Sequence, residues 1–216
     1  MGLLSLSALR EKARQTLQGR WMNFVGYTLV ILIITAMIPN ALEKIDPKDS
    51  FGIGTVLSLL YSLLVVNAVN LGVNALYLRA TRGEEISLGM IFNFFTNGRY
   101  AKAILFYLLM GIYLFLWSLL LVIPGIIKSF SYAMAPFILI EDPRLTVNEA
   151  ITRSREMMNG HKWKLFCLYL SFIGWSLLSI LTLGIGLLWL IPYAETSLAH
   201  FYLELKNKRR PFHAVE

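Results

Sequence analysis

The sequence predicts an all-α, polytopic integral membrane protein: a single membrane domain over residues 1–216 with about six transmembrane helices in three hairpins. One observation is composition, since the chain is 56% hydrophobic and 15% charged, whereas soluble domains have about 25% charged residues. The other is the length of the apolar runs, most of which reach the roughly 20 residues that cross a bilayer as a helix. The runs lie at about 21–42, 53–78, 103–123, 126–140, 165–181 and 187–205.

Two short motifs divide the apolar sequence into hairpins. The stretch 165–205 is too long for one span, and "TLGIG" at 182–186 divides it where glycines permit a tight turn. "IPG" at 123–125 separates the third run from the fourth in the same way. The alternative is five spans with a re-entrant fourth segment, because the run at 126–140 is short.

Basic residues predict the orientation. Of the 20 Lys and Arg, all but Lys44, Lys48 and Lys128 lie on one side of the six-span arrangement. The cytoplasmic loops of membrane proteins carry an excess of Lys and Arg. We therefore expect a protein of the cytoplasmic membrane with both termini in the cytoplasm. The net charge of +7 therefore favours membrane lipids with anionic headgroups at the cytosolic face as partners, and not nucleic acid.

A glycine followed by cationic and aromatic residues recurs before each predicted hairpin. We interpret each copy as an elbow between an amphipathic helix on the cytosolic surface and a spanning helix, with cations and rings at the lipid headgroups. The alternative is topological anchoring alone. The recurrence also suggests internal repeats at 1–78, 79–140 and 141–210. The elbow residues are Gly19, Arg20, Trp21, Gly98, Arg99, Tyr100, Gly160, His161, Lys162 and Trp163.

The surface helix before the third elbow has the clearest pattern. "TVNE" at 146–149 is a capping box, in which Thr146 and Glu149 satisfy backbone amides at a helix start. We expect the apolar face that follows to lie in the headgroup boundary. That face comprises Val147, Ala150, Ile151, Met157 and Met158.

The second span contains a polar stripe. Asn67, Asn70 and Asn74 fall within an arc of about 60° on a helix that turns about 100° per residue. Amide side chains facing lipid would lose their hydrogen bonds, so the stripe must face protein or water. It either holds helices together or forms one wall of a hydrated cavity.

Glu195 is the strongest candidate for a functional residue, because a carboxylate within a membrane helix is expensive unless it is paired, protonated or hydrated. The alternative is a shallower, irregular segment after Pro192 in which Glu195 meets water. His200 is a candidate to share a proton with Glu195, or else an interhelical histidine. We expect Lys128 near the outer interface, with an ion pair to Glu195 as the alternative.

Motifs of common enzymes are missing from the sequence. His161, His200 and His213 do not form the i, i+4 pair of a metal-binding helix, and no H-E-x-x-H, G-x-S-x-G or phosphate-binding Gly-Lys loop occurs. We therefore expect no enzymatic activity, metal or cofactor. "EDP" at 141–143 is interpreted as a turn, and Cys167 as a packing residue.

Several long blocks resemble a known family. They are "WSLLLVIPGIIKSFSYAMAPFILIEDP" at 117–143, "SREMMNGHKWKLFCLYLSFIGW" at 154–175, "TLGIGLLWLIPY" at 182–193 and "ALREKARQTLQGRW" at 8–21. They are similar to blocks of the bacterial integral membrane proteins grouped as domain of unknown function 975. The resemblance implies a multi-span protein of the bacterial cytoplasmic membrane and implies no catalytic residues.

From the residues we predict a non-enzymatic membrane protein that binds or transports a small or lipid-like ligand. The predicted ligand-binding residues are Glu195, Asn67, Asn70, Asn74 and His200. The alternative is a membrane scaffold whose surface helices recruit envelope or signalling partners. A homo-oligomer or an unidentified membrane partner fits either function.

Overall fold

A computed structural model describes residues 4–47, 51–96 and 98–209, and these ranges contain helices and turns but no strand. The α-helices are α1 (Leu6–Leu17), α2 (Trp21–Leu32), α3 (Ile38–Glu43), α4 (Ile53–Tyr61), α5 (Asn67–Thr81), α6 (Asn93–Thr96), α7 (Tyr100–Leu120), α8 (Val122–Tyr132), α9 (Ala135–Glu141), α10 (Val147–Met157), α11 (Lys162–Leu181) and α12 (Leu187–Arg209). Two π-helical turns, Ile33–Met37 and Ser62–Val66, continue α2 into α3 and α4 into α5. A 3₁₀ turn, Leu88–Phe92, precedes α6. Lys48, Arg210 and His213 lie outside the described residues.

Within the described ranges, five helical segments are long and apolar enough to cross a membrane. They are Trp21–Glu43, Ile53–Thr81, Tyr100–Leu119, Val122–Glu141 and Lys162–Leu181. The all-helical, multi-pass character expected from the apolar runs is therefore supported. The expected sixth span corresponds to α12, which is not among the five, because polar residues such as Glu195, Thr196 and His200 lower its mean hydropathy.

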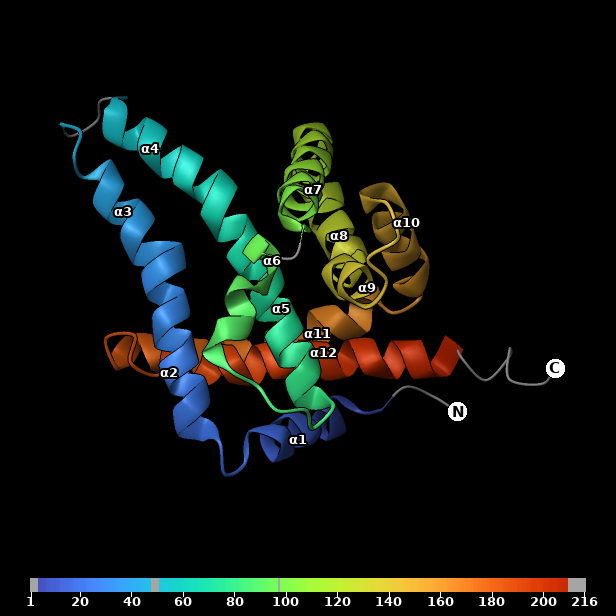
Figure 1. Cartoon of the computed structure of the whole chain (residues 1–216). Helices are drawn as coiled ribbons and strands as arrows, with labels where there is room; N and C mark the ends of the chain where they lie inside the picture. Colours follow the sequence, from blue (N-terminus) through green and yellow to red (C-terminus); the bar gives the residue numbers. More distant parts are fainter. Residues whose placement is uncertain (1–3, 48–50, 97, 210–216) are drawn as a thin grey trace.

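The apolar helices form three hairpin arms that lie apart at their tips. Contacts join α3 to α4, α7 to α8 and α11 to α12, and Figure 1 shows the α3–α4 end separated from the turn between α11 and α12. Large apolar side chains are exposed on the tips, as at Ile123 and Leu183. Such surfaces are stable in lipid, where apolar side chains meet hydrocarbon.

The main core lies where the arms meet, in a region that we call the base. The base consists of α1, α5, α9, α10 and the part of α12 after Glu195. Helix α12 contacts α1, α2, α5 and α11, and Figure 1 shows it running beside α1. Phe137 of α9 stacks on Tyr202 of α12 with ring centroids 5.2 Å apart, and both side chains are fully buried.

The turns at two arm tips differ in how they use glycine. Between α11 and α12, Leu183 and Gly184 have φ of 54° and 86°, so the turn expected at "TLGIG" is present. Between α7 and α8 the helix instead breaks at Leu121, whose backbone is extended, and "IPG" lies in the first turn of α8. The expected break is thus shifted toward the N-terminus, because proline is well accommodated in the first turn of a helix.

All three predicted elbows have the same backbone conformation. The elbow glycines have positive φ, 78° at Gly19, 64° at Gly98 and 75° at Gly160, and each is followed by one residue with ψ of 8°, 2° and −3° in turn. The next residue begins α2, α7 or α11. Glycine is favoured there because a positive φ is costly for residues that carry a Cβ.

The apolar face of α10 packs inside the protein and not in the headgroup layer, so that expectation is wrong. Val147, Ala150, Ile151, Met157 and Met158 are all buried. The chain doubles back after Glu141, and α10 then lies against α9, α8 and α7. Similarly, α1 buries Leu9, Ala13 and Leu17 and contacts α12, α11 and α5.

The start of α10 agrees with its sequence signature. The amide of Glu149 donates to the Thr146 hydroxyl at 3.3 Å, and the Thr146 amide donates to Glu149 Oε2 at 2.7 Å. Hydrogen bonds from the backbone and side chain of Thr146 lower the pKa of Glu149. The capping box predicted from "TVNE" is confirmed.

Candidate functional site

Glu195 lies three residues after Pro192 within continuous helix, so the irregular segment considered as an alternative is not present. Its side chain is partly buried, and within the described ranges it has no hydrogen-bond or ion-pair partner. Its charge interacts with the hydroxyl groups of Tyr77 on α5, Tyr107 on α7 and Tyr169 on α11. Four helices therefore contribute to the surroundings of one carboxylate.

Unpaired hydroxyl groups accompany the carboxylate. In the described part of the chain, the buried hydroxyls of Thr28, Tyr77 and Thr196 make no hydrogen bond of normal geometry. Thr28 and Tyr77 are near enough to interact, and Thr196 adjoins Glu195. A buried hydroxyl without a partner costs about 1 to 3 kcal/mol. The proximity of Thr28 and Tyr77 to one another, and of Tyr77 to Glu195, favours a polar guest, such as water or a ligand head, in this region.

Among the described residues, Asn74 is the only member of the asparagine stripe that hydrogen-bonds to another helix. Asn74 Nδ2 donates to the Tyr107 hydroxyl at 3.2 Å and to the Asn70 carbonyl at 2.8 Å. Asn67 Nδ2 donates at 3.1 Å to the carbonyl of Leu63, which lies four residues earlier in the same helical segment. The structure therefore brings Asn74 into the Glu195 cluster through Tyr107, and it describes no contact between Glu195 and Asn67 or Asn70.

His200 does not face Glu195, and it is instead the interhelical histidine that the sequence analysis gave as the other possibility. Its Nε2 atom forms a hydrogen bond of 2.8 Å with the Thr16 hydroxyl on α1. Five residues along a helix correspond to a rotation of about 140°, which points the two side chains in different directions. His200 thus joins α12 to α1.

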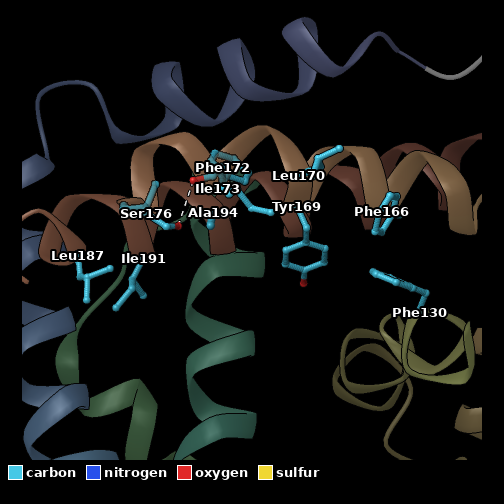
Figure 2. Close-up of a pocket in the computed structure, with 11 residues that line it drawn as sticks. Phe130, Phe166, Tyr169, Leu170, Phe172, Ile173, Ser176, Leu187, Ile191 and Ala194 are labelled. Carbon is cyan, nitrogen blue, oxygen red and sulfur yellow. Dashed lines mark hydrogen bonds between the residues drawn. The ribbon is translucent and has the colours of Figure 1, made fainter. Parts of the chain in front are cut away.

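An apolar pocket of about 400 Å³ adjoins the Glu195 cluster. It is lined by residues of α8, α11 and α12. Figure 2 shows the Tyr169 ring projecting from α11, and its centroid lies 6.1 Å from that of the Phe130 ring on α8. Tyr169 lines the pocket and interacts with Glu195, while Ala194 lines it from the position next to Glu195. Glu195 itself does not line the pocket, and Tyr169 is the residue that connects the apolar pocket to the carboxylate.

Comparison with known proteins identifies the family of the chain. Residues 3–128 and 118–209 match the model of a family described as protein of unknown function (DUF975). The chain belongs to the DUF975 family. No curated protein and no solved structure matches it. For this DUF975 protein, the site is thus defined by the geometry of its own residues.

The third elbow of the DUF975 protein borders a polar pocket of about 350 Å³. Lys128, Arg155 and Lys162 line it together with Glu156, and the three cations repel one another. The Lys128 ammonium also lies 4.1 Å from the centre of the Trp117 ring. Lys128 therefore lies beside the cations of α10 and α11, and no ion pair between Lys128 and Glu195 occurs in the described part of the chain.

The aromatic residues of the elbows differ in their surroundings. The Trp21 ring lies 6.4 Å from that of Tyr193, and the Tyr100 hydroxyl donates to the Leu64 carbonyl at 2.9 Å. Trp163 remains 74% exposed, although its ring lies 5.1 Å from that of Phe166. Only the third elbow thus presents an exposed ring beside its cations.

Sequence reasoning missed Glu141, which was interpreted as part of a turn. Its carboxylate forms ion pairs with Arg82 after α5 and Lys206 on α12, and it accepts a hydrogen bond of 2.6 Å from Tyr202. Glu141 thus links the inner ends of all three arms of the DUF975 protein. The available signal was an acid at the end of a long apolar run, since such a group needs a partner.

Proposed function

We propose that this protein is a non-enzymatic membrane protein that binds or transports a small or lipid-like ligand at the Glu195 site. The observation that carries the proposal is the partly buried carboxylate, which has no partner within the described ranges and lies among three tyrosines. An unpaired charge in a poorly hydrated site is unfavourable. A ligand with a cationic or hydrogen-bond-donating head would offset that cost.

The adjoining pocket supports a ligand that is partly apolar. Its volume of about 400 Å³ falls within the roughly 300 to 1,000 Å³ of small-molecule sites. Phe130, Phe166 and Phe172 line it with aliphatic residues, and these side chains suit an alkyl or aromatic tail. Tyrosine rings near a carboxylate are also favourable surroundings for an ammonium group.

The alternative, a scaffold that recruits partners through its amphipathic helices, has less support. The apolar faces of α1 and α10 are buried within the base. A partner protein would meet only their polar faces. The ligand-binding function is therefore the better-supported proposal.

Replacing Glu195 tests the proposal directly. Glu195→Gln keeps the shape of the side chain and removes its charge, so we expect a folded protein whose co-purifying lipid or small molecule is depleted. Native mass spectrometry measures the bound species, and thermal unfolding measures stability. Glu204→Gln is the matched control on α12, because its amide can still accept from the Leu4 amide. An unchanged bound species in a Glu195→Gln protein of normal stability would favour the scaffold.

Two asparagine variants test whether the asparagine stripe lines a hydrated cavity or holds helices together. Asn74→Leu removes the bond to Tyr107, so it should destabilise the protein by about 0.6 kcal/mol. Asn70 makes no described side-chain hydrogen bond, so Asn70→Leu should cause little loss and a change in solvent access. Thermal unfolding and hydrogen exchange measure the two effects. Equal losses in both variants would assign the whole stripe to adhesion.

For membrane topology, we propose six spans in three hairpins, with α12 as the sixth and both termini in the bacterial cytoplasm. Nine of the 20 Lys and Arg lie on helices of the base, and others, such as Arg82 and Arg99, lie in the turns beside these helices, which fits a cytosolic surface beside anionic headgroups. Elbow cations such as Arg20, Arg99 and Lys162 would then meet lipid phosphates. The shared backbone of the elbows supports repeat units at 1–78, 79–140 and 141–210.

Cysteine labelling checks this topology. In a Cys167→Ser background, a membrane-impermeant maleimide should label Lys44→Cys, near the tip of the first arm, in intact cells. It should label Glu85→Cys, between the first two hairpins, only after permeabilisation. Labelling of position 85 in intact cells would contradict the proposed orientation.

A further inference from the structure

A second groove lies between α1 and the α11–α12 hairpin. It has a volume of about 490 Å³ and is lined by Arg10, Arg14 and Trp21 with residues of both hairpin helices. Its α11 residues, such as Trp175 and Leu178, lie about 180° around the helix from those that line the Glu195 pocket. The two cavities therefore lie on different sides of α11, and Leu190 of α12 lines both.

Arginine makes this groove cationic. Arg10 is partly buried and has no hydrogen-bond or ion-pair partner in the part of the chain described. Arg14 has only a long contact with Glu11, 3.8 Å between Nε and Oε2, and both side chains are more than half exposed. Such a pair is worth little in stability. The two guanidinium groups are thus available to bind an anion, and guanidinium matches the geometry of phosphate.

The rest of the groove is apolar and aromatic. It contains three of the chain's five tryptophans, Trp21, Trp175 and Trp189. Leu178 and Leu190 continue the apolar wall, and Tyr193 lies beside Trp21. Amphipathic rings of this kind favour the boundary between headgroups and acyl chains. A guest that fits both parts must carry an anionic head and an alkyl tail.

We propose that this groove binds an anionic glycerophospholipid, with its phosphate on Arg10 and Arg14 and an acyl chain along Trp175, Leu178 and Trp189. The positive charges of Arg10 and Arg14 favour an anionic lipid over neutral or cationic amphiphiles. The site goes beyond the ligand function proposed above, since the Glu195 pocket suits a head of opposite charge. Binding here is independent of Glu195.

Tryptophan fluorescence tests the proposal. The full chain with Trp117→Phe and Trp163→Phe keeps only the three groove tryptophans, and it is reconstituted in phosphatidylcholine nanodiscs. Bromine on acyl chains quenches nearby indoles. We expect brominated phosphatidylglycerol to quench at lower mole fraction than brominated phosphatidylcholine, by about fivefold for each arginine engaged. Equal quenching by the two lipids would overturn the proposal.

Matched variants locate the effect. Arg10→Gln with Arg14→Gln should abolish the preference for phosphatidylglycerol. Lys12→Gln with Lys208→Gln removes the same charge from exposed positions on α1 and α12 that belong neither to the groove lining nor to an elbow, and should leave the preference intact. An equal loss in both double variants would indicate a general surface-charge effect and overturn the site.

Two further measurements keep the result interpretable. If the double arginine variant fails to fold, as judged by circular dichroism, Leu178→Phe narrows the groove without changing charge and should also weaken the preference. Inorganic phosphate at millimolar concentration should not reduce the quenching by brominated phosphatidylglycerol. Complete loss of that quenching would indicate that the arginines bind free phosphate, and would overturn the proposal of a lipid site. Glu195→Gln should leave the quenching unchanged, so failure of one site does not affect the other.

Discussion

Glu141→Ala is expected to reduce the free energy of unfolding by roughly 2 to 4 kcal/mol. The change leaves Arg82 and Lys206 without their shared counter-charge and the buried Tyr202 hydroxyl without the acceptor that Glu141 provides. Breaking a fully buried pair costs about 3 to 5 kcal/mol. The two cations are 36% and 25% exposed, which lowers the expected value. Thermal unfolding of the purified protein in detergent measures the effect.

Glu84→Ala supplies the control for this prediction. Its ion pair with Arg79 is 3.8 Å long and nearly half exposed on both sides, so its loss should change stability by at most about 1 kcal/mol. Glu141→Gln keeps an acceptor for Tyr202 and should fall between the two. Equal stability of Glu141→Ala and Glu84→Ala would show that the arms are not held together by this carboxylate.

Gly72→Val should destabilise the protein by about 1 to 3 kcal/mol or more. A Cβ at Gly72 of α5 would collide with the backbone of Ile91 in the 3₁₀ turn before α6. No side-chain rotation relieves a collision with backbone, so the turn must move away from α5. Thermal unfolding reports the loss of stability, and hydrogen exchange should show weaker protection at residues 88–92.

The comparison for Gly72 is another helical glycine. A Cβ at Gly111 of α7 meets nothing within 4 Å, so Gly111→Ala should be neutral or stabilising by up to about 1 kcal/mol. If Gly72→Val were as mild as Gly111→Ala, the close approach of α5 to the turn would not matter for stability.

The elbows were predictable because their signal is local. A positive φ between two helices favours glycine, and Gly19, Gly98 and Gly160 each mark such a place in the sequence. Apolar run length likewise located the arms, and the pattern "TVNE" located the start of α10. In each case the information lies within a few residues of the feature.

Other features depend on contacts between distant segments. Amphipathic spacing showed that Met157 and Met158 need an apolar environment, but it could not distinguish protein from lipid. The orientation of His200 toward Thr16 depends on where α1 lies. The candidate site was therefore found in part: Glu195 and Asn74 were expected, whereas the three tyrosines around Glu195 come from helices that only the fold brings together.

The packing of α1 against α12 has a consequence for biosynthesis. The Leu4 amide and the Thr16 hydroxyl find their partners at Glu204 and His200, near the other end of the chain. Each arm consists of neighbouring segments and is able to enter the membrane as it leaves the ribosome. Helix α1, however, must wait for α12. An unfinished chain therefore exposes the apolar face of α1, which a completed chain covers with α12. Chaperones and proteases can use this exposed face to recognise incomplete chains.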